Sequence, residues 1–125
     1  MLDGLLCYNR WIRDFEDSEK VRAAGDSYCY GVYRDTHKAA TGFLREIAPN
    51  FPDATDQLEA AATHFAAEAE ALAGGEQVLW WNAPEDPDPQ TNARVVEVLT
   101  KARDHYGRGI DAIEQALAQI PADPS

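Results

Sequence analysis

Three histidines are the side chains in this sequence best suited to chemistry, and each lies in a different segment of helical periodicity: His37, His64 and His105. At 1.5 Å per residue, His37 and His64 fall roughly 20 Å and roughly 21 Å from the turn near Asn50, so the two could share one layer of a helical bundle. Three imidazoles at one level can hold a divalent metal and leave a coordination position open. The alternative, which we favour, is that each histidine is half-exposed and hydrogen-bonded at the edge of an apolar stripe. No metal ligand or cofactor is therefore assigned.

The two cysteines are the other candidates for reactivity. Cys29 and His37 lie two turns apart on one predicted helix, or roughly 12 Å, which is too far for the hydrogen bond that activates a thiolate. We therefore interpret Cys29, and Cys7 in the same way, as small buried hydrophobic residues. The sequence has no G-x-S-x-G, P-loop or H-E-x-x-H motif, which favours a non-enzyme without catalytic residues.

A candidate pocket is predicted from the polar and aromatic residues around His37. Arg34 is interpreted as one half of a surface ion pair. The alternatives are a buried ion pair with a carboxylate of another helix and an anion contact for a ligand. The adjacent tryptophans lie in an acidic, proline-rich connection and are expected to cover an open end or groove. A core and a dimer interface explain the many aromatic residues at least as well as a ligand pocket does. The candidate pocket contains Tyr33, Arg34, His37, His64, His105, Trp80 and Trp81.

The elements that must position these residues are helices. Apolar residues recur three or four positions apart in every long segment, for example from Val95 to Ile120, and no segment alternates with period two. Asp88-Pro89 is typical of a helix start, and Pro49 and Gly74-Gly75 are typical of helix ends. We expect one all-α domain over residues 1–125, an antiparallel four-helix bundle with a long Trp- and Pro-containing loop between its third and fourth helices. The expected helices are about 3–16, 27–48, 53–73 and 89–120, with Asp26 or Ser27 capping the second and Asp53 the third.

Composition narrows the partners. The chain has 125 residues and a net charge of −11, from 22 acidic and 11 basic side chains. This charge argues against nucleic acid and against anionic membrane surfaces. No apolar run approaches the roughly 20 residues that cross a bilayer, and the N-terminus has no basic leader. Two cysteines make no disulfide framework, so a cytoplasmic protein with reduced thiols is expected.

The first half of the chain resembles a known family of bacterial proteins. The residues that carry the resemblance are Gly4-x-x-x-Tyr8-x-x-Trp11-Ile12-x-Asp14, then Arg34, then Ala39-Ala40-x-x-Phe43-Leu44-Arg45-Glu46-Ile47. Over roughly residues 4 to 72 the chain is similar to the helical C-terminal part of cysteine-peptidase-like proteins, the group that includes the butirosin-type acyltransferases. In that family an upstream papain-like domain carries the thiol chemistry. The resemblance therefore implies a helical module without its catalytic domain, and the Trp80-Trp81 loop and the fourth helix have no counterpart in it.

Taken together, these patterns predict a non-catalytic helical module that acts through protein association, most simply as a homodimer. The alternative is a bundle that binds a small molecule or a divalent metal through histidines on three helices.

Overall fold

The computed structural model is all-helical, as the sequence predicts. The structure describes residues 2–17, 19–81, 83 and 88–120, and these contain no strand. None of the helices in these residues is both long and apolar enough to cross a membrane. In chain order the elements are α1 (Leu2–Glu16), α2 (Ala24–Ile47), the 3-10 helix η1 (Ala48–Asn50), α3 (Thr55–Ala73), the short α4 (Glu76–Leu79) and α5 (Pro89–Gln119).

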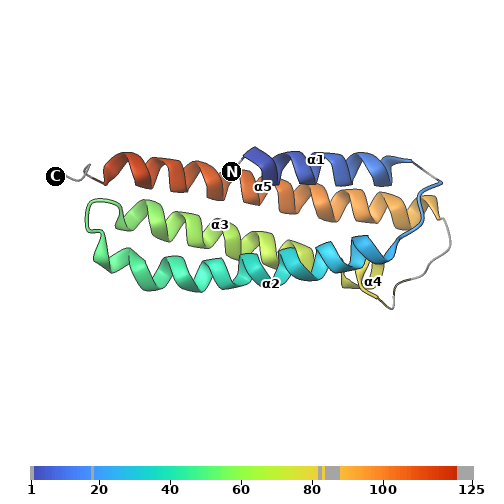
Figure 1. Cartoon of the computed structure of the whole chain (residues 1–125), viewed down its shortest axis with the longest axis horizontal. Helices are drawn as coiled ribbons and strands as arrows, with labels where there is room; N and C mark the ends of the chain where they lie inside the picture. The colour runs from blue at the N-terminus through green and yellow to red at the C-terminus, as the bar shows by residue number, and fades with distance from the viewer. Residues whose placement is uncertain (1, 18, 82, 84–87, 121–125) are drawn as a thin grey trace.

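The long helices run along one axis and form an elongated molecule (Figure 1). α3 packs most extensively against α5 and next against α2, while α1 packs on α5. The backbones of α1 and α2 do not pack closely along their length; side chains join them instead. The indole N–H of Trp11, for example, donates to the carboxylate of Asp26 at 3.0 Å.

The helix ends differ from the predicted ones for local reasons. α2 begins three residues early, at Ala24, and its cap position is Ala23 rather than Asp26 or Ser27. Asp26 still serves the helix end, because its carboxylate accepts from the backbone N–H of Ala23 at 2.8 Å. Asp53 does not cap the third helix: a turn closed by the hydrogen bond from Ala54 N–H to Phe51 C=O, at 2.8 Å, delays the start of α3 to Thr55.

The connection between α3 and α5 contains a helix that the sequence prediction missed. α4 is a single turn, and Leu79 within it is fully buried, so burial of one leucine anchors a segment that was predicted to be irregular. The prolines predicted for this loop, Pro84 and Pro87, lie outside the described residues, as does Pro121, the predicted stop of the last helix. The predicted start of that helix is confirmed: the Asp88 carboxylate accepts from the Gln90 N–H at 2.9 Å, and Pro89 occupies the first helical position.

The buried apolar residues form two clusters, one toward each end of the molecule. The first joins α1, α2, α3, α4 and α5 around Tyr8, Phe15, Tyr30 and Leu99. The second joins α2, α3 and α5 and contains no residue of α1. The reason is helix length. α1 has 15 residues and α5 has 31, so α1, at about 22 Å, covers only about half of α5, at about 46 Å.

Candidate functional site

The most distinctive polar feature of the interior is a three-residue cluster, which we call the polar centre: Tyr8 of α1, His37 of α2 and Glu68 of α3. The Tyr8 hydroxyl donates to Oε2 of Glu68 at 2.5 Å, and Nδ1 of His37 lies 2.5 Å from the same oxygen. Glu68 is 0% exposed, and its other oxygen, Oε1, is buried with no hydrogen-bond partner in the described part of the chain. A buried carboxylate is costly unless it is paired and hydrogen-bonded. The polar centre therefore joins three helices through one carboxylate oxygen.

Aromatic rings enclose the polar centre. The imidazole of His37 stacks on Tyr106, with ring centroids 5.3 Å apart and an interplanar angle of 23°, and lies 5.3 Å from the ring of Tyr33. Burial raises the pKa of Tyr8 far above its usual value, and the negative charge and hydrogen bond of Glu68 add to the shift. Tyr8 is therefore a neutral donor at physiological pH. The side chain of His37 keeps 20% of its surface exposed, so it is the one member of the centre that solvent reaches.

The structure does not bring the three histidines into a group that could hold a metal ion. No group of three or more His, Cys, Asp or Glu side chains within the described residues is placed to hold a metal ion. Nδ1 of His37 contacts the carboxylate of Glu68, whereas Nδ1 of His105 is buried without a hydrogen-bond partner among the described residues. His64 is half-buried on α3. Of the seven predicted pocket residues, the structure brings Tyr33 and His37 together at the polar centre.

Arg34 and the tryptophans form a separate group near α4. The guanidinium of Arg34 lies 4.7 Å from the centroid of the Trp80 ring and 5.3 Å from that of Tyr30, and its Nε contacts the Asp35 carboxylate at 3.2 Å. This agrees with the ion-pair interpretation and adds two cation–π contacts. Trp81 is half-exposed.

Both cysteines contradict the sequence interpretation: Cys7 and Cys29 are exposed free thiols, not buried hydrophobic residues. The physical reason is their position next to a buried tyrosine. Tyr8 and Tyr30 take the core positions of α1 and α2, and successive residues on a helix point about 100° apart. Both thiols border a space between α1 and α2.

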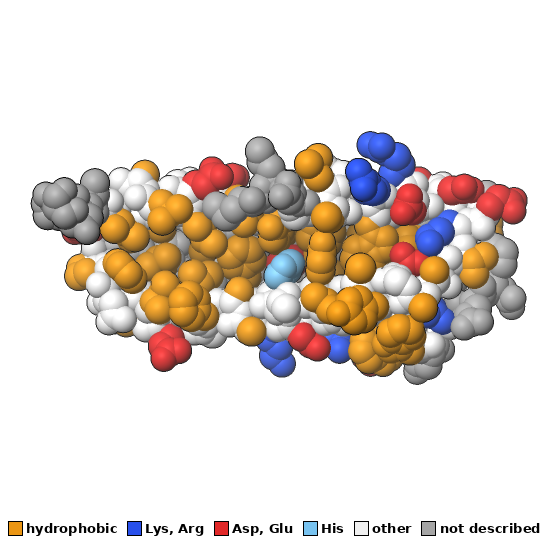
Figure 2. Space-filling view, in the orientation of Figure 1, with side chains coloured by type: hydrophobic (Ala, Val, Ile, Leu, Met, Phe, Trp, Pro, Cys, Tyr) orange, Lys and Arg blue, Asp and Glu red, His pale blue; other side chains and the backbone are white. Residues whose placement is uncertain are grey.

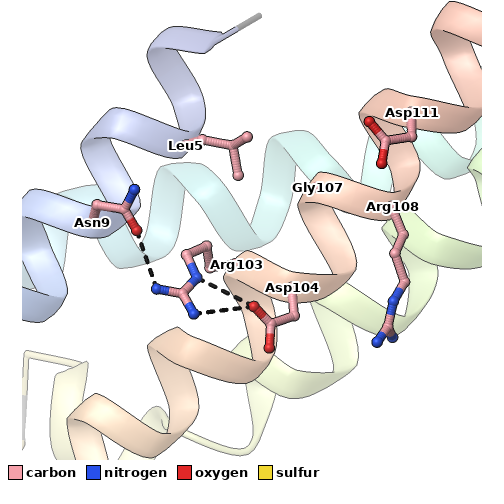
Figure 3. A pocket seen from close by; sticks show the side chains of 7 residues that line it. All are labelled: Leu5, Asn9, Arg103, Asp104, Gly107, Arg108 and Asp111. Atoms are coloured by element: carbon pink, nitrogen blue, oxygen red, sulfur yellow. Dashed lines mark hydrogen bonds and ion pairs between the residues drawn. The ribbon is translucent and has the colours of Figure 1, made fainter.

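A cavity of about 530 Å³ lies at the outer junction of α1 and α5 (Figure 3). Arg103 is held there by its own neighbours, Asn9 at 3.1 Å and Asp104 at 3.1 Å. Arg108 points away from this group (Figure 3). Because the guanidinium of Arg103 is already paired, the arrangement fixes α1 on α5 and offers little to a ligand.

Beyond the N-terminal end of α1, the sides of α2 and α5 that α1 would otherwise cover carry apolar residues. An added Cβ at Gly4 would meet the Tyr106 ring, which places the first turn of α1 over Tyr106. From Tyr106, α5 continues for about 20 Å without α1. We call this region the uncovered face: Phe43, Ile47, Ile113, Leu117 and Ile120. Figure 2 shows hydrophobic side chains gathered along the half of this view that α1 does not reach. Phe43 is 60% exposed and Leu117 59%.

Tyr8 and Glu68 were not among the predicted site residues. Glu68 lies in an alanine-rich helix that places it among solvated glutamates by composition, and only its position three residues after buried Phe65 and four before buried Leu72 marks it as inward-facing. That spacing was the signal available in the sequence. Comparison with known proteins found no matching family model, no similar curated protein and no similar solved structure.

Proposed function

We propose that this chain is a helical association module that dimerises with a second copy through the uncovered face. In this proposal the molecule is an antiparallel four-helix bundle in which one helix, α1, has only half the required length. The observation that carries the proposal is the exposure of Phe43 and Leu117 where α1 ends.

The size of the face limits the strength of an interface between two copies. The uncovered part of α5 extends about 20 Å, and two neighbouring helices span about 20 Å, which gives roughly 400 Å² of flat area per chain. Two such areas fall short of the roughly 1,200 Å² of a standard stable interface. The proposed dimer is therefore weak, with dissociation in the micromolar range.

Charge also supports this choice of surface. Two copies that each carry −11 repel one another, so they can approach most easily through a patch without charged side chains. The five residues of the uncovered face are all uncharged. A two-fold arrangement would place the same patch on both sides of the interface.

The test is the molar mass by light scattering or sedimentation over a concentration series. We expect the mass to rise from one chain toward two across the micromolar range, and the Leu117→Glu variant to remain monomeric because it places two like charges together in the interface. Raising the salt concentration from about 0.05 M to about 0.5 M should strengthen the dimer, since salt screens the repulsion between the acidic chains.

Tyr28→Glu is the matched control. Tyr28 is an exposed aromatic on α2, 66% accessible, beside Trp81 and away from the uncovered face. It should dimerise as the unchanged protein does. A mass of one chain at every concentration, or equal loss of dimer in both variants, would refute the proposal.

A second candidate function is binding of a small cationic or hydrogen-bond-donating molecule at the polar centre. The unpartnered Oε1 of Glu68 and the exposed edge of His37 favour it. Methylammonium is a suitable probe: a saturable shift of the His37 ring signals in NMR, lost in Glu68→Gln, is expected. Unchanged signals at millimolar probe would remove this candidate.

The two remaining expectations stay proposals. The two free thiols support a cytoplasmic setting, because reducing compartments keep thiols unpaired. The similarity to the helical part of the cysteine-peptidase-like proteins remains a prediction, and it is compatible with a module that works by association.

A further inference from the structure

The two thiols line one cavity between α1 and α2. Cys7 of α1 and Cys29 of α2 both border this space, which measures about 330 Å³, together with Trp11 and Tyr33. α1 and α2 run in opposite directions (Figure 1), and the bond between Trp11 and Asp26 sets their register. One turn before Trp11, Cys7 therefore lies opposite the part of α2 that carries Cys29 and Tyr33.

Tyr33 lies beside the two thiols in the same cavity. Burial raises the pKa of Tyr33 well above its usual value, and a hydrogen bond with Cys7 and the charges of the Cys7 and Cys29 thiolates add to the shift. Tyr33 borders the same cavity as both thiols, so the three side chains share one space.

A direct disulfide does not suit this arrangement. It requires Cα atoms about 4.4–6.8 Å apart, whereas the backbones of α1 and α2 do not pack closely. A link with one further atom between the sulfurs spans a larger separation. Because no third His, Cys, Asp or Glu among the described residues completes a metal site, the linking atom must be satisfied by two ligands.

We propose that Cys7 and Cys29 form a two-coordinate site for a soft monovalent cation, Cu(I), which joins α1 to α2. Soft thiolate ligands select Cu(I). Both thiols lose their protons, two S–Cu bonds form, and copper stays in the monovalent state, so the site gains a charge of −1 and releases two protons. Arg10 and Lys20 border the same cavity, where Lys20 also pairs with Asp26 at 2.9 Å.

The test is an anaerobic titration of the reduced protein with Cu(I) against a chromophoric Cu(I) chelator. We expect one Cu(I) per chain, a thiolate-to-copper absorption band, and two fewer thiols available to a thiol reagent. Cys7→Ser and Cys29→Ser should each lower the affinity by more than roughly 100-fold, since loss of a ligand costs more than the 10–100-fold typical of a lost outer partner.

Val32→Ser is the control: it lies one turn from Cys29 on α2 but borders a different cavity, and it should bind Cu(I) as the unchanged protein does. The titration is repeated in Leu117→Glu, so that the result does not depend on the proposed dimer. Unchanged affinity in either cysteine variant, or one Cu(I) per two chains that is lost in Leu117→Glu, would overturn the proposal. Ready formation of an intrachain disulfide on mild oxidation would also overturn it, because the separation of the helices would then be smaller than argued.

Discussion

Replacing Tyr8 with phenylalanine tests the energetic role of the polar centre most directly. The change removes one hydroxyl and no ring, so the packing of Tyr8 against Tyr33 and Tyr106 is retained. It deletes a 2.5 Å hydrogen bond to a carboxylate that is 0% exposed. Hydrogen bonds to charged groups contribute about 1.5–3 kcal/mol, and Glu68 would keep only its contact with His37. We expect the free energy of unfolding to fall by about 2 kcal/mol.

The assay is urea denaturation followed by circular dichroism, with thermal melting as a second measure. For a chain of this length about 2 kcal/mol corresponds to a melting temperature lower by about 8 °C. Tyr28→Phe is the matched control, because that ring is exposed and surface changes usually stay within about 0.5 kcal/mol.

A double-mutant cycle with Glu68→Gln separates the hydrogen bond from other effects. Residues in direct contact show coupling energies of about 0.5–3 kcal/mol, and we expect at least about 1 kcal/mol between Tyr8 and Glu68. A loss below about 0.5 kcal/mol in Tyr8→Phe, together with additive energies in the cycle, would refute the interpretation of Glu68 as a paired buried carboxylate.

Three further predictions concern packing, pH and the loop after α4. An added Cβ at buried Gly109 would lie 2.7 Å from the Phe65 ring, so Gly109→Ala should lower the free energy of unfolding in urea by about 1–3 kcal/mol. Gly42 is the control: an added Cβ there would meet nothing within 4 Å, so Gly42→Ala should raise the free energy of unfolding by up to about 1 kcal/mol. Because the pKa of Tyr8 is raised in the folded state, the contribution of Tyr8 to stability is complete below pH about 10 and is lost as the pH rises above it. Above pH about 10, the difference in free energy of unfolding between the unchanged protein and Tyr8→Phe should therefore shrink by up to about 1.4 kcal/mol per pH unit. A difference that stays constant with pH would contradict this. Arg22 donates to two backbone carbonyls after α4, at 3.3 Å and 3.1 Å; Arg22→Ala should speed amide hydrogen exchange in that segment and leave exchange in α3 unchanged.

The helices could be predicted well from the sequence, but the side-chain contacts between helices could not, for a physical reason. Helical periodicity and the Asp88-Pro89 start are local signals, so the all-α class and the start of α5 could be predicted. Burial of Glu68 depends on Tyr8, which lies 60 residues away in the chain, and no local signal reports such a pairing. Cys29 was misplaced because neighbouring Tyr30 takes the core position. A one-residue difference on a helix decides which side chain is buried.

The polar centre also explains why α1 covers only part of α5. The buried carboxylate of Glu68 is stabilised by both Tyr8 and His37, and loss of the Tyr8 hydrogen bond alone would cost about 2 kcal/mol. Tyr8 can reach it only when α1 lies in its present register, with Gly4 over Tyr106 and His37 stacked on the same ring. That register places the first turn of α1 near the middle of α5 and leaves Ile113 and Leu117 beyond it. The residues that fix α1 and the residues of the uncovered face are therefore linked. A variant that releases α1, such as Tyr8→Phe with Glu68→Gln, should expose more apolar surface and change association as well as stability.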